Sequence, residues 1–212
     1  MKRFLIPSLF ISFMLASCFT SFQPLVTYEN ITTDNRLAGS WEQSGKNVLI
    51  RELGKSHLGN LFADARKENK PFSERDSIFL SKHYVITYRE KGVAYTWVAA
   101  LVKIGQSTFV NLAPEECNIG NKIITPKGED TYSFAKLEWN TGNSCQLRFL
   151  DGDYIKELVL NNKIRIRHEY DPLFGTFVIT ASAQELEQFL EKYGNDERVY
   201  KRGNSINLSR KI

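Results

Sequence analysis

The strongest constraint on the fold is a stretch in the middle of the chain where apolar side chains recur at every second position. Residues 83–90 and 93–103 alternate in this way, and residues 108–112 form a shorter apolar run. The pairs Lys91-Gly92 and Gly105-Gln106 separate the three runs. Side chains on a strand alternate between the two faces of a sheet, and short turns bring successive strands together. The pattern predicts a three-stranded antiparallel meander.

Further elements are predicted on both sides of the meander. The other strand candidates cover residues 48–53, 133–139, 144–150, 163–169, 176–180 and 205–210. Apolar residues at helical spacing predict helices over 56–69, 153–160 and 183–193. The last helix has the clearest start, because Ser182 and Glu185 form a capping box. Residues 70–77 are expected to be a loop and residues 113–130 an irregular connection.

These elements predict an α+β fold made mostly of antiparallel strands. We expect about eight or nine strands with two or three helices, arranged as a curved sheet or a lipocalin-like barrel. The barrel form rests partly on Gly39-Ser40-Trp41, which resembles the G-x-W that opens lipocalin-like barrels. The resemblance implies that Trp41 packs across the closed end of the barrel. Ordinary core packing of Trp41 is the alternative.

The first eighteen residues have the pattern of an export signal. Lys2 and Arg3 precede a mostly apolar run, 4–16, that is too short to span a bilayer core comfortably. The next residues complete the sequence Leu15-Ala16-Ser17-Cys18, which resembles the lipobox of bacterial lipoproteins. The resemblance implies that a diacylglycerol is attached to Cys18, that cleavage precedes it, and that its new amino group is acylated. The alternative is a secretory signal with a chance cysteine.

The lipobox divides the chain into three parts. We expect a signal peptide over 1–17, a lipidated cysteine with a tether over 18–36, and a single globular β-rich domain over 37–212. Phe19 stands where lipoproteins retained at the inner membrane of enteric bacteria have Asp. The expected location is therefore the cell envelope, at the outer membrane and facing the periplasm.

The charge of the chain gives little support to nucleic-acid binding. The formal net charge is +4, and it falls to +2 once Lys2 and Arg3 are removed with the signal. Residues 197–212 carry five basic residues and one acidic residue. This run is expected to be the solvated face of an edge strand. Contact with anionic lipid headgroups is the alternative.

Two cysteines remain after lipidation, Cys117 and Cys145. An oxidising periplasm would allow them to form a disulfide, and two free buried thiols are the alternative. Neither cysteines nor histidines have the spacing of a metal site, so we expect no metal and no cofactor.

No complete catalytic motif is found in the sequence, and we expect that the protein is not an enzyme. Ser133 and Lys136 match S-x-x-K, but the motifs that accompany it in penicillin-recognising enzymes are missing. The expected function is a non-catalytic module that binds a small apolar ligand or an envelope partner. Trp97 and Ala99 share one face of a predicted strand and are candidates to line the ligand cavity. The alternatives are a structural or assembly protein acting through its surface, or an enzyme with an unrecognised site.

Overall fold

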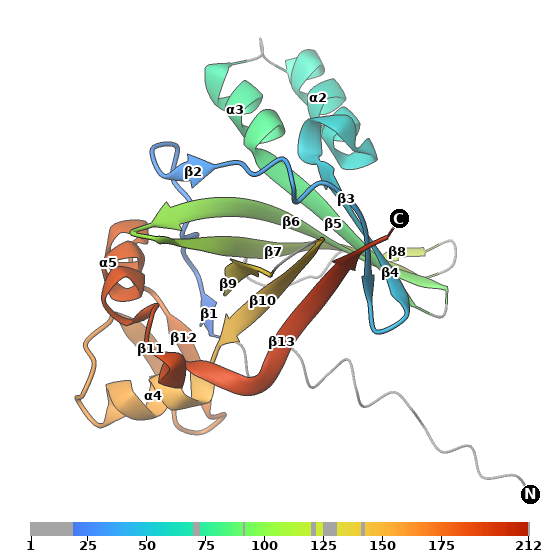
Figure 1. The fold of residues 1–212 in the computed structure, drawn as a ribbon. Helices are drawn as coiled ribbons and strands as arrows, with labels where there is room; N and C mark the ends of the chain where they lie inside the picture. The colour runs from blue at the N-terminus through green and yellow to red at the C-terminus, as the bar shows by residue number, and fades with distance from the viewer. Residues whose placement is uncertain are drawn as a thin grey trace, which may run out of the picture.

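The computed structural model describes residues 19–69, 73–90, 92–119, 122–124, 131–140 and 143–211. Within them, eight strands close into an antiparallel barrel (Figure 1). These strands are β3 (Gly39–Gln43), β4 (Lys46–Glu52), β5 (His83–Glu90), β6 (Val93–Ile104), β7 (Ser107–Ile119), β9 (Tyr132–Trp139), β10 (Ser144–Leu150) and β13 (Tyr200–Arg210). Each pairs with the next, and β13 returns to pair with β3. The prediction of a lipocalin-like barrel with mostly antiparallel strands is confirmed.

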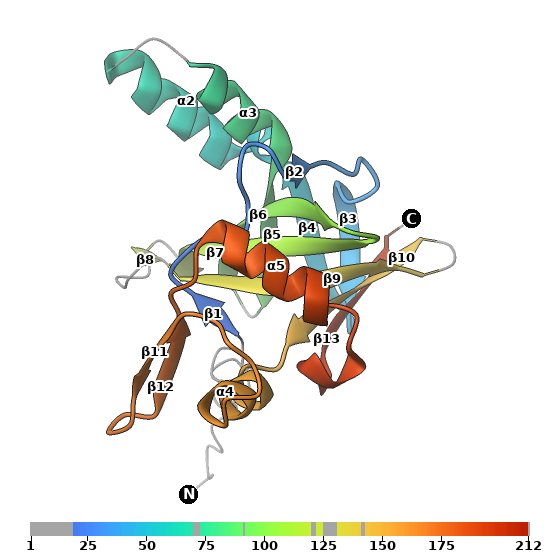
Figure 2. The ribbon, with the colours of Figure 1, turned by 90° about the vertical axis from the view of Figure 1, so that its left-hand side faces the viewer.

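The remaining elements lie around the barrel. The helices are α2 (His57–Asn69), α3 (Glu74–Lys82), α4 (Gly152–Leu160) and α5 (Ala183–Tyr193), with short 3-10 turns η1 (Leu53–Lys55) and η2 (Glu197–Val199). The short strands are β1 (Thr20–Ser21), β2 (Ile31–Thr32), β8 (Lys122–Ile124), β11 (His168–Asp171) and β12 (Thr176–Ile179). Figures 1 and 2 show α2 and α3 projecting together from one side, while α4, α5 and the β11–β12 hairpin lie on another side.

Helix α3 was missed by the sequence patterns, which assigned its first turn to a loop. A capping box starts the helix, because Ser73 Oγ accepts a hydrogen bond from the Asp76 backbone and the Asp76 carboxylate accepts one from the Ser73 backbone. Two reciprocal bonds satisfy backbone N–H groups that a helix start otherwise leaves unpaired. The described residues therefore contain four α-helices, against the expected two or three.

The barrel interior is filled by one cluster of apolar side chains. Its buried members are Leu37, Trp41, Val48, Ile50, Tyr84, Ala99, Leu101, Val110, Ala135, Leu137, Cys145, Leu147 and Leu208. They come from all eight barrel strands and from the segment before β3. The hydrophobic effect therefore favours the closed form, since opening any seam would expose part of this one cluster.

A second apolar cluster lies on the outer face of the barrel wall. Val102 of β6, Phe109 of β7 and Phe134 of β9 point away from the interior and pack against α5. Side chains next to them in sequence, such as Leu101 and Val110, belong to the inner cluster. These strands are therefore buried on both faces, which explains why parts of them read as continuous apolar runs.

The segment after Cys18 is part of the fold, and its prediction as a tether is wrong. Phe19 is 2% exposed and lies between the rings of Phe134 and Phe189, at centroid distances of 5.8 and 5.7 Å. Leu25 is fully buried in the same outer cluster. β1 pairs with β9 and β12, and β2 pairs with β6. The chain therefore belongs to the folded domain from Phe19, the first described residue, onward.

Three further expectations are corrected by the strand pairing. β7 continues to Ile119 and β8 follows it, where an irregular connection was expected. The strand expected over 163–169 begins only at His168. The basic C-terminal run includes β13, which is paired on both sides and is therefore not an edge strand.

Helix α2 has the predicted N-cap, and the glycine near its start has a packing role. Ser56 Oγ accepts a hydrogen bond of 3.0 Å from the Gly59 backbone. A Cβ at position 59 would lie 2.0 Å from the backbone oxygen of Leu53 in η1. Only glycine allows the helix to approach η1 this closely.

We predict that Leu190→Ala lowers the free energy of unfolding by about 2–5 kcal/mol, because it removes a buried side chain from the interface between α5 and the barrel wall. Leu190 is buried in the outer cluster, as the helical spacing predicted. Chemical denaturation measures the change. The control is Glu191→Ala, at the exposed neighbouring position. Equal midpoints for the two variants would contradict the packing of α5.

Candidate functional site

A hollow of the described structure lies at one end of the barrel, beside Trp41. It has a volume of about 270 Å³ and opens to solvent. Its lining residues are Arg36, Trp41, Trp139, Asn140, Asn143 and Arg210. They come from the segment before β3, from β3 and β13, and from the end of β9 and the loop that follows it. We call this feature the barrel-end hollow.

Trp41 forms the floor of the barrel-end hollow. Its side chain is 1% exposed, and its indole N–H donates a 2.8 Å hydrogen bond to the Leu37 carbonyl. The Trp139 ring lies at a centroid distance of 6.1 Å, and the Arg210 guanidinium carbon lies 4.7 Å from the Trp41 ring centroid. The indole is thus shielded from water, as the G-x-W resemblance implied.

Gly39 allows Arg210 to reach across Trp41. A Cβ at position 39 would lie 2.8 Å from Arg210 Nη1, and Gly39 has φ +151°. The Arg210 guanidinium donates hydrogen bonds to the carbonyls of Arg36 and Ala38. The last strand of the barrel is therefore joined to the segment before the first one by backbone pairing and by this side chain.

The second guanidinium of the hollow belongs to Arg36. Arg36 stacks on Trp139, with its guanidinium carbon 4.3 Å from the ring centroid, and pairs with Asp34 at 2.6 Å. Hydrogen bonds from Arg36 lower the pKa of the Asp34 carboxyl. The Arg36 side chain is 64% exposed, so water and solutes reach it.

The six lining residues supply two indoles, two guanidinium groups and two amides. Flat apolar faces beside positive charge suit an aromatic or carboxylate-bearing group. The lining contains no hydroxyl, thiol, imidazole or carboxylate that could act as a nucleophile or a general base. The arrangement is therefore chemically suited to binding.

A second, more open hollow of about 370 Å³ lies between α4, the segment after it and α5. It is lined by Val159, Asn162, Ile164, Arg165, Ile166, Arg167, His168 and Glu185. Arg167 pairs there with Glu185 at 3.0 Å, as Arg36 pairs with Asp34 beside the barrel-end hollow. Its lining has no tryptophan, whereas the barrel-end hollow combines two indoles with two guanidinium groups.

The candidate ligand-lining residues do not border either hollow. Ala99 is fully buried within the inner cluster. Trp97 lies opposite Ile86 in the β5–β6 pairing and stacks on Tyr95 at a ring-centroid distance of 6.2 Å. The small side chain of Ala99 makes room for packed neighbours, and the cavity expected from it is not among the hollows described above.

The structure does not bring Cys117 and Cys145 together. Cys145 is a free thiol in the inner cluster, and burial raises its pKa to about 11. Cys145 lies opposite Trp139 of β9. Trp139 is two residues after Leu137, and Leu137 pairs with Thr108 of β7. Cys117 lies near the far end of β7, nine residues from Thr108. Its side chain, like the whole of Cys18, lies outside the described residues.

The three histidines lie on separate elements. His57 begins α2, His83 begins β5, and His168 begins β11. Burial lowers the pKa of His83, whose ring nitrogen lies 2.9 Å from the Phe79 carbonyl. Among the described side chains, no group of three or more His, Cys, Asp or Glu residues is placed to hold a metal ion.

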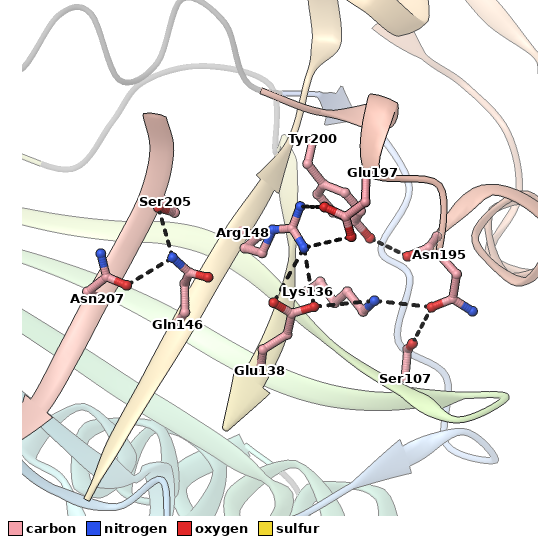
Figure 3. Close-up of polar contacts among 11 residues, drawn as sticks. Ser107, Lys136, Glu138, Gln146, Arg148, Asn195, Glu197, Tyr200, Ser205 and Asn207 are labelled. Carbon is pink, nitrogen blue, oxygen red and sulfur yellow. Dashed lines mark hydrogen bonds and ion pairs between the residues drawn. The ribbon is translucent and has the colours of Figure 1, made fainter. Parts of the chain in front are cut away.

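A polar network on the outer face of β9, β10 and the start of β13 was also missed (Figure 3). Glu138 lies 3.4 Å from both Lys136 and Arg148. Arg148 also pairs with Glu197 and lies over the Tyr200 ring, 4.5 Å from its centroid. Tyr200 donates a hydrogen bond to the Gly194 carbonyl. These groups satisfy one another and connect the end of α5 to the barrel, which is a structural role.

The signals for the barrel-end hollow were weak in the sequence. Trp41 was identified by its motif, but Arg36, Trp139 and Arg210 belong to no motif, and Arg210 is 174 residues from Arg36. Their meeting depends on barrel closure, which strand periodicity does not specify.

Comparisons with protein-family models, with curated proteins and with solved structures found no match. The described strands form a lipocalin-like antiparallel β-barrel of eight strands, with a hollow at one end. Among the described helices, none has the length and apolar character required to cross a bilayer.

We predict that Arg210→Met lowers the free energy of unfolding by about 1–3 kcal/mol and shifts the tryptophan emission to longer wavelength. The variant keeps an unbranched apolar chain but loses the cation–π contact and the hydrogen bonds to two carbonyls. Denaturation followed by fluorescence measures both effects. Lys211→Met is the matched control, because Lys211 is exposed. An Arg210→Met variant as stable as this control would show that the contact with Trp41 contributes nothing.

Proposed function

We propose that the chain is a bacterial lipoprotein held at the outer membrane through lipid on Cys18, with a non-catalytic barrel domain that binds an envelope protein in the periplasm. The anchoring is supported by the lipobox and by the basic and apolar segment before it. It is also compatible with the described core. Because Phe19 is the first described residue of the core, cleavage before Cys18 would leave every described residue of the domain in the mature chain.

The filled barrel interior is the observation that favours a protein partner. A barrel that encloses a small ligand needs interior side chains that leave space, and here the interior side chains form one buried cluster. The binding surface is then sought on the outside. Tryptophan and arginine are the residues that most often dominate the binding energy of protein interfaces, and the barrel-end hollow brings together two of each.

The open shape of the hollow suits a side chain from a partner. An aromatic or acidic side chain could stack on Trp139 and approach Arg36, which is exposed and already tolerates a carboxylate neighbour. This places the proposed contact at the end of the barrel rather than inside it.

A small ligand held in the same hollow is the second candidate. Its volume of about 270 Å³ is just below the range usual for small-molecule sites, and the half-buried Trp139 indole offers an apolar face. This candidate retains the small-ligand function expected from the sequence but moves the site from the interior to the barrel end.

The anchoring is tested by Cys18→Ala. We expect this variant to lose incorporation of radioactive palmitate and to keep its signal peptide, because the lipid-accepting thiol is gone. Gel autoradiography and intact-mass measurement give the two readouts. Cys145→Ala, which removes a buried thiol, is the control and keeps its label. Equal labelling of the Cys18→Ala variant and the wild type would refute lipidation at Cys18.

The binding surface is tested by a photo-reactive amino acid placed in living cells at Asn140, an exposed residue that lines the hollow. We expect a protein adduct that is lost when Arg36→Ala is added, since the exposed guanidinium is part of the contact. The same probe at Gln188, an exposed position of α5, is the control. An adduct that is unaffected by Arg36→Ala would contradict the proposed surface.

The small-ligand candidate is distinguished from the protein partner by titrating the purified protein with a panel of aromatic and fatty carboxylates. Saturable binding that Arg36→Ala weakens, with no protein adduct at Asn140, would favour the small ligand over the protein partner.

A further inference from the structure

The most exposed apolar side chains of the described structure are adjacent, at the tip of the β11–β12 hairpin. Leu173 is 88% exposed and Phe174 is 83% exposed. Figure 2 shows this hairpin extending away from the barrel. Single exposed apolar residues are common on protein surfaces. Two large ones side by side at the end of a projecting hairpin form a small apolar patch.

The turn that carries these side chains is held by specific contacts. Asp171 Oδ1 accepts hydrogen bonds from the backbone N–H groups of Leu173, at 2.8 Å, and of Phe174, at 3.3 Å. Gly175 has φ +68°, a conformation that favours glycine. Lys156 of α4 donates a 3.0 Å hydrogen bond to the Gly175 carbonyl and lies over the Tyr170 ring. The tip is thus fastened to α4, with its two apolar side chains directed outward.

The start of the domain is oriented toward the same tip. β1 runs parallel to β12, with Ser21 opposite Ile179, and the Phe22 backbone donates a 3.0 Å hydrogen bond to the Ile179 carbonyl. Going back along the chain from Ser21 therefore follows β12 back from Ile179 toward Thr176, where the hairpin turn begins. Phe19, the first described residue, is buried in the outer cluster.

The number of residues from the β1–β12 pairing limits how far Cys18 and Phe174 can each lie from it. Cys18 is three residues before Ser21, so it lies at most about 10 Å away. Phe174 is five residues before Ile179 and lies in the turn, so it is at most about 17 Å away along the hairpin. With both segments fully extended, the apolar tip would project about 7 Å beyond the residue that carries the lipid, which is comparable to the depth of about 5–10 Å that interfacial apolar groups reach in a bilayer.

We propose that Leu173 and Phe174 insert into the membrane that holds the lipid on Cys18, as a second attachment point beside the anchor. This inference rests on the proposed lipid anchoring. The surface that we propose for the tip is the phospholipid bilayer, because β1 runs parallel to β12 and its first residue therefore lies toward the hairpin turn.

The second contact would fix the orientation of the domain. An acyl anchor alone holds one point, about which the domain could turn. In Figures 1 and 2 the C-terminal end of β13, which carries Arg210 of the barrel-end hollow, lies across the barrel from the hairpin. Insertion of the tip would therefore direct the hollow away from the membrane.

Charge contributes little to this contact. Glu169, Asp171 and Lys156 surround the tip, and they include both signs. Binding should therefore depend on apolar insertion and change little when anionic lipid is added, whereas an electrostatic contact would strengthen with it.

The test uses the full-length gene with Phe174→Trp, and the mature lipoprotein is reconstituted in phosphatidylcholine vesicles. Lipids brominated near the middle of the acyl chain quench indoles that enter the bilayer. The quenching of the wild type, which has three tryptophans, is subtracted. The matched control is Leu61→Trp, because Leu61 is another exposed apolar residue, on α2, away from the hairpin. Unchanged thermal midpoints verify that both variants fold.

We expect the added quenching to be at least about threefold greater for Phe174→Trp than for Leu61→Trp, and to fall when Leu173→Ser is added. Equal quenching at the two positions would overturn the inference, as would none at Phe174→Trp.

Mass spectrometry of the peptide that contains Cys18 distinguishes a failure of insertion from a failure of anchoring. A lipidated Cys18 with an unquenched Phe174→Trp overturns the insertion and leaves the anchoring intact. An unmodified Cys18 refutes the anchoring, and unlipidated protein mixed with the same vesicles then decides the insertion by the same quenching difference.

Discussion

The pairing of the last strand with the first strand of the barrel is the constraint on which the rest of the structure depends. Arg210 lies opposite Trp41 in the register of β13 and β3, and its guanidinium covers the indole. Without this seam, β3 and β13 would each present unpaired backbone groups, and the inner cluster would open at Trp41. The same contact forms the barrel-end hollow, so barrel closure and the candidate site share residues.

The two-sided burial of β6, β7 and β9 determines what lies outside the barrel. Val102, Phe109 and Phe134 make one stretch of its outer face apolar, and that face needs a cover. Helix α5 provides part of it and Phe19 another part. A segment with few charges was read as a tether because it lacks periodicity, yet low charge is also what a segment needs to pack on an apolar wall.

The sequence predicted well wherever local rules decide the structure. The meander, the capping box at Ser182 and the buried face of α5 follow from periodicity and local hydrogen bonds. Contacts between distant residues were not accessible in this way. The pairing of Cys117 with Cys145 looked open because their positions along β7 and β10 were unknown. The hollow needed Arg210 and Arg36 to meet across most of the chain. Strand register sets both, and periodicity leaves register free.

The packed barrel makes this domain a rigid body, and the two proposed contacts use different parts of its surface. The inner cluster holds the strands together, so the distance between the barrel-end hollow and the β11–β12 tip should stay the same when a partner or a membrane contacts either one. The proposed insertion of Leu173 and Phe174 would then do more than add affinity to an anchor that already holds. Because Phe19 and β1 are packed into the fold, a membrane contact at the tip would set the direction of the whole barrel. The C-terminal end of β13, which carries Arg210 of the hollow, lies across the barrel from the hairpin (Figures 1 and 2), so that direction would turn the hollow toward the partners that we propose.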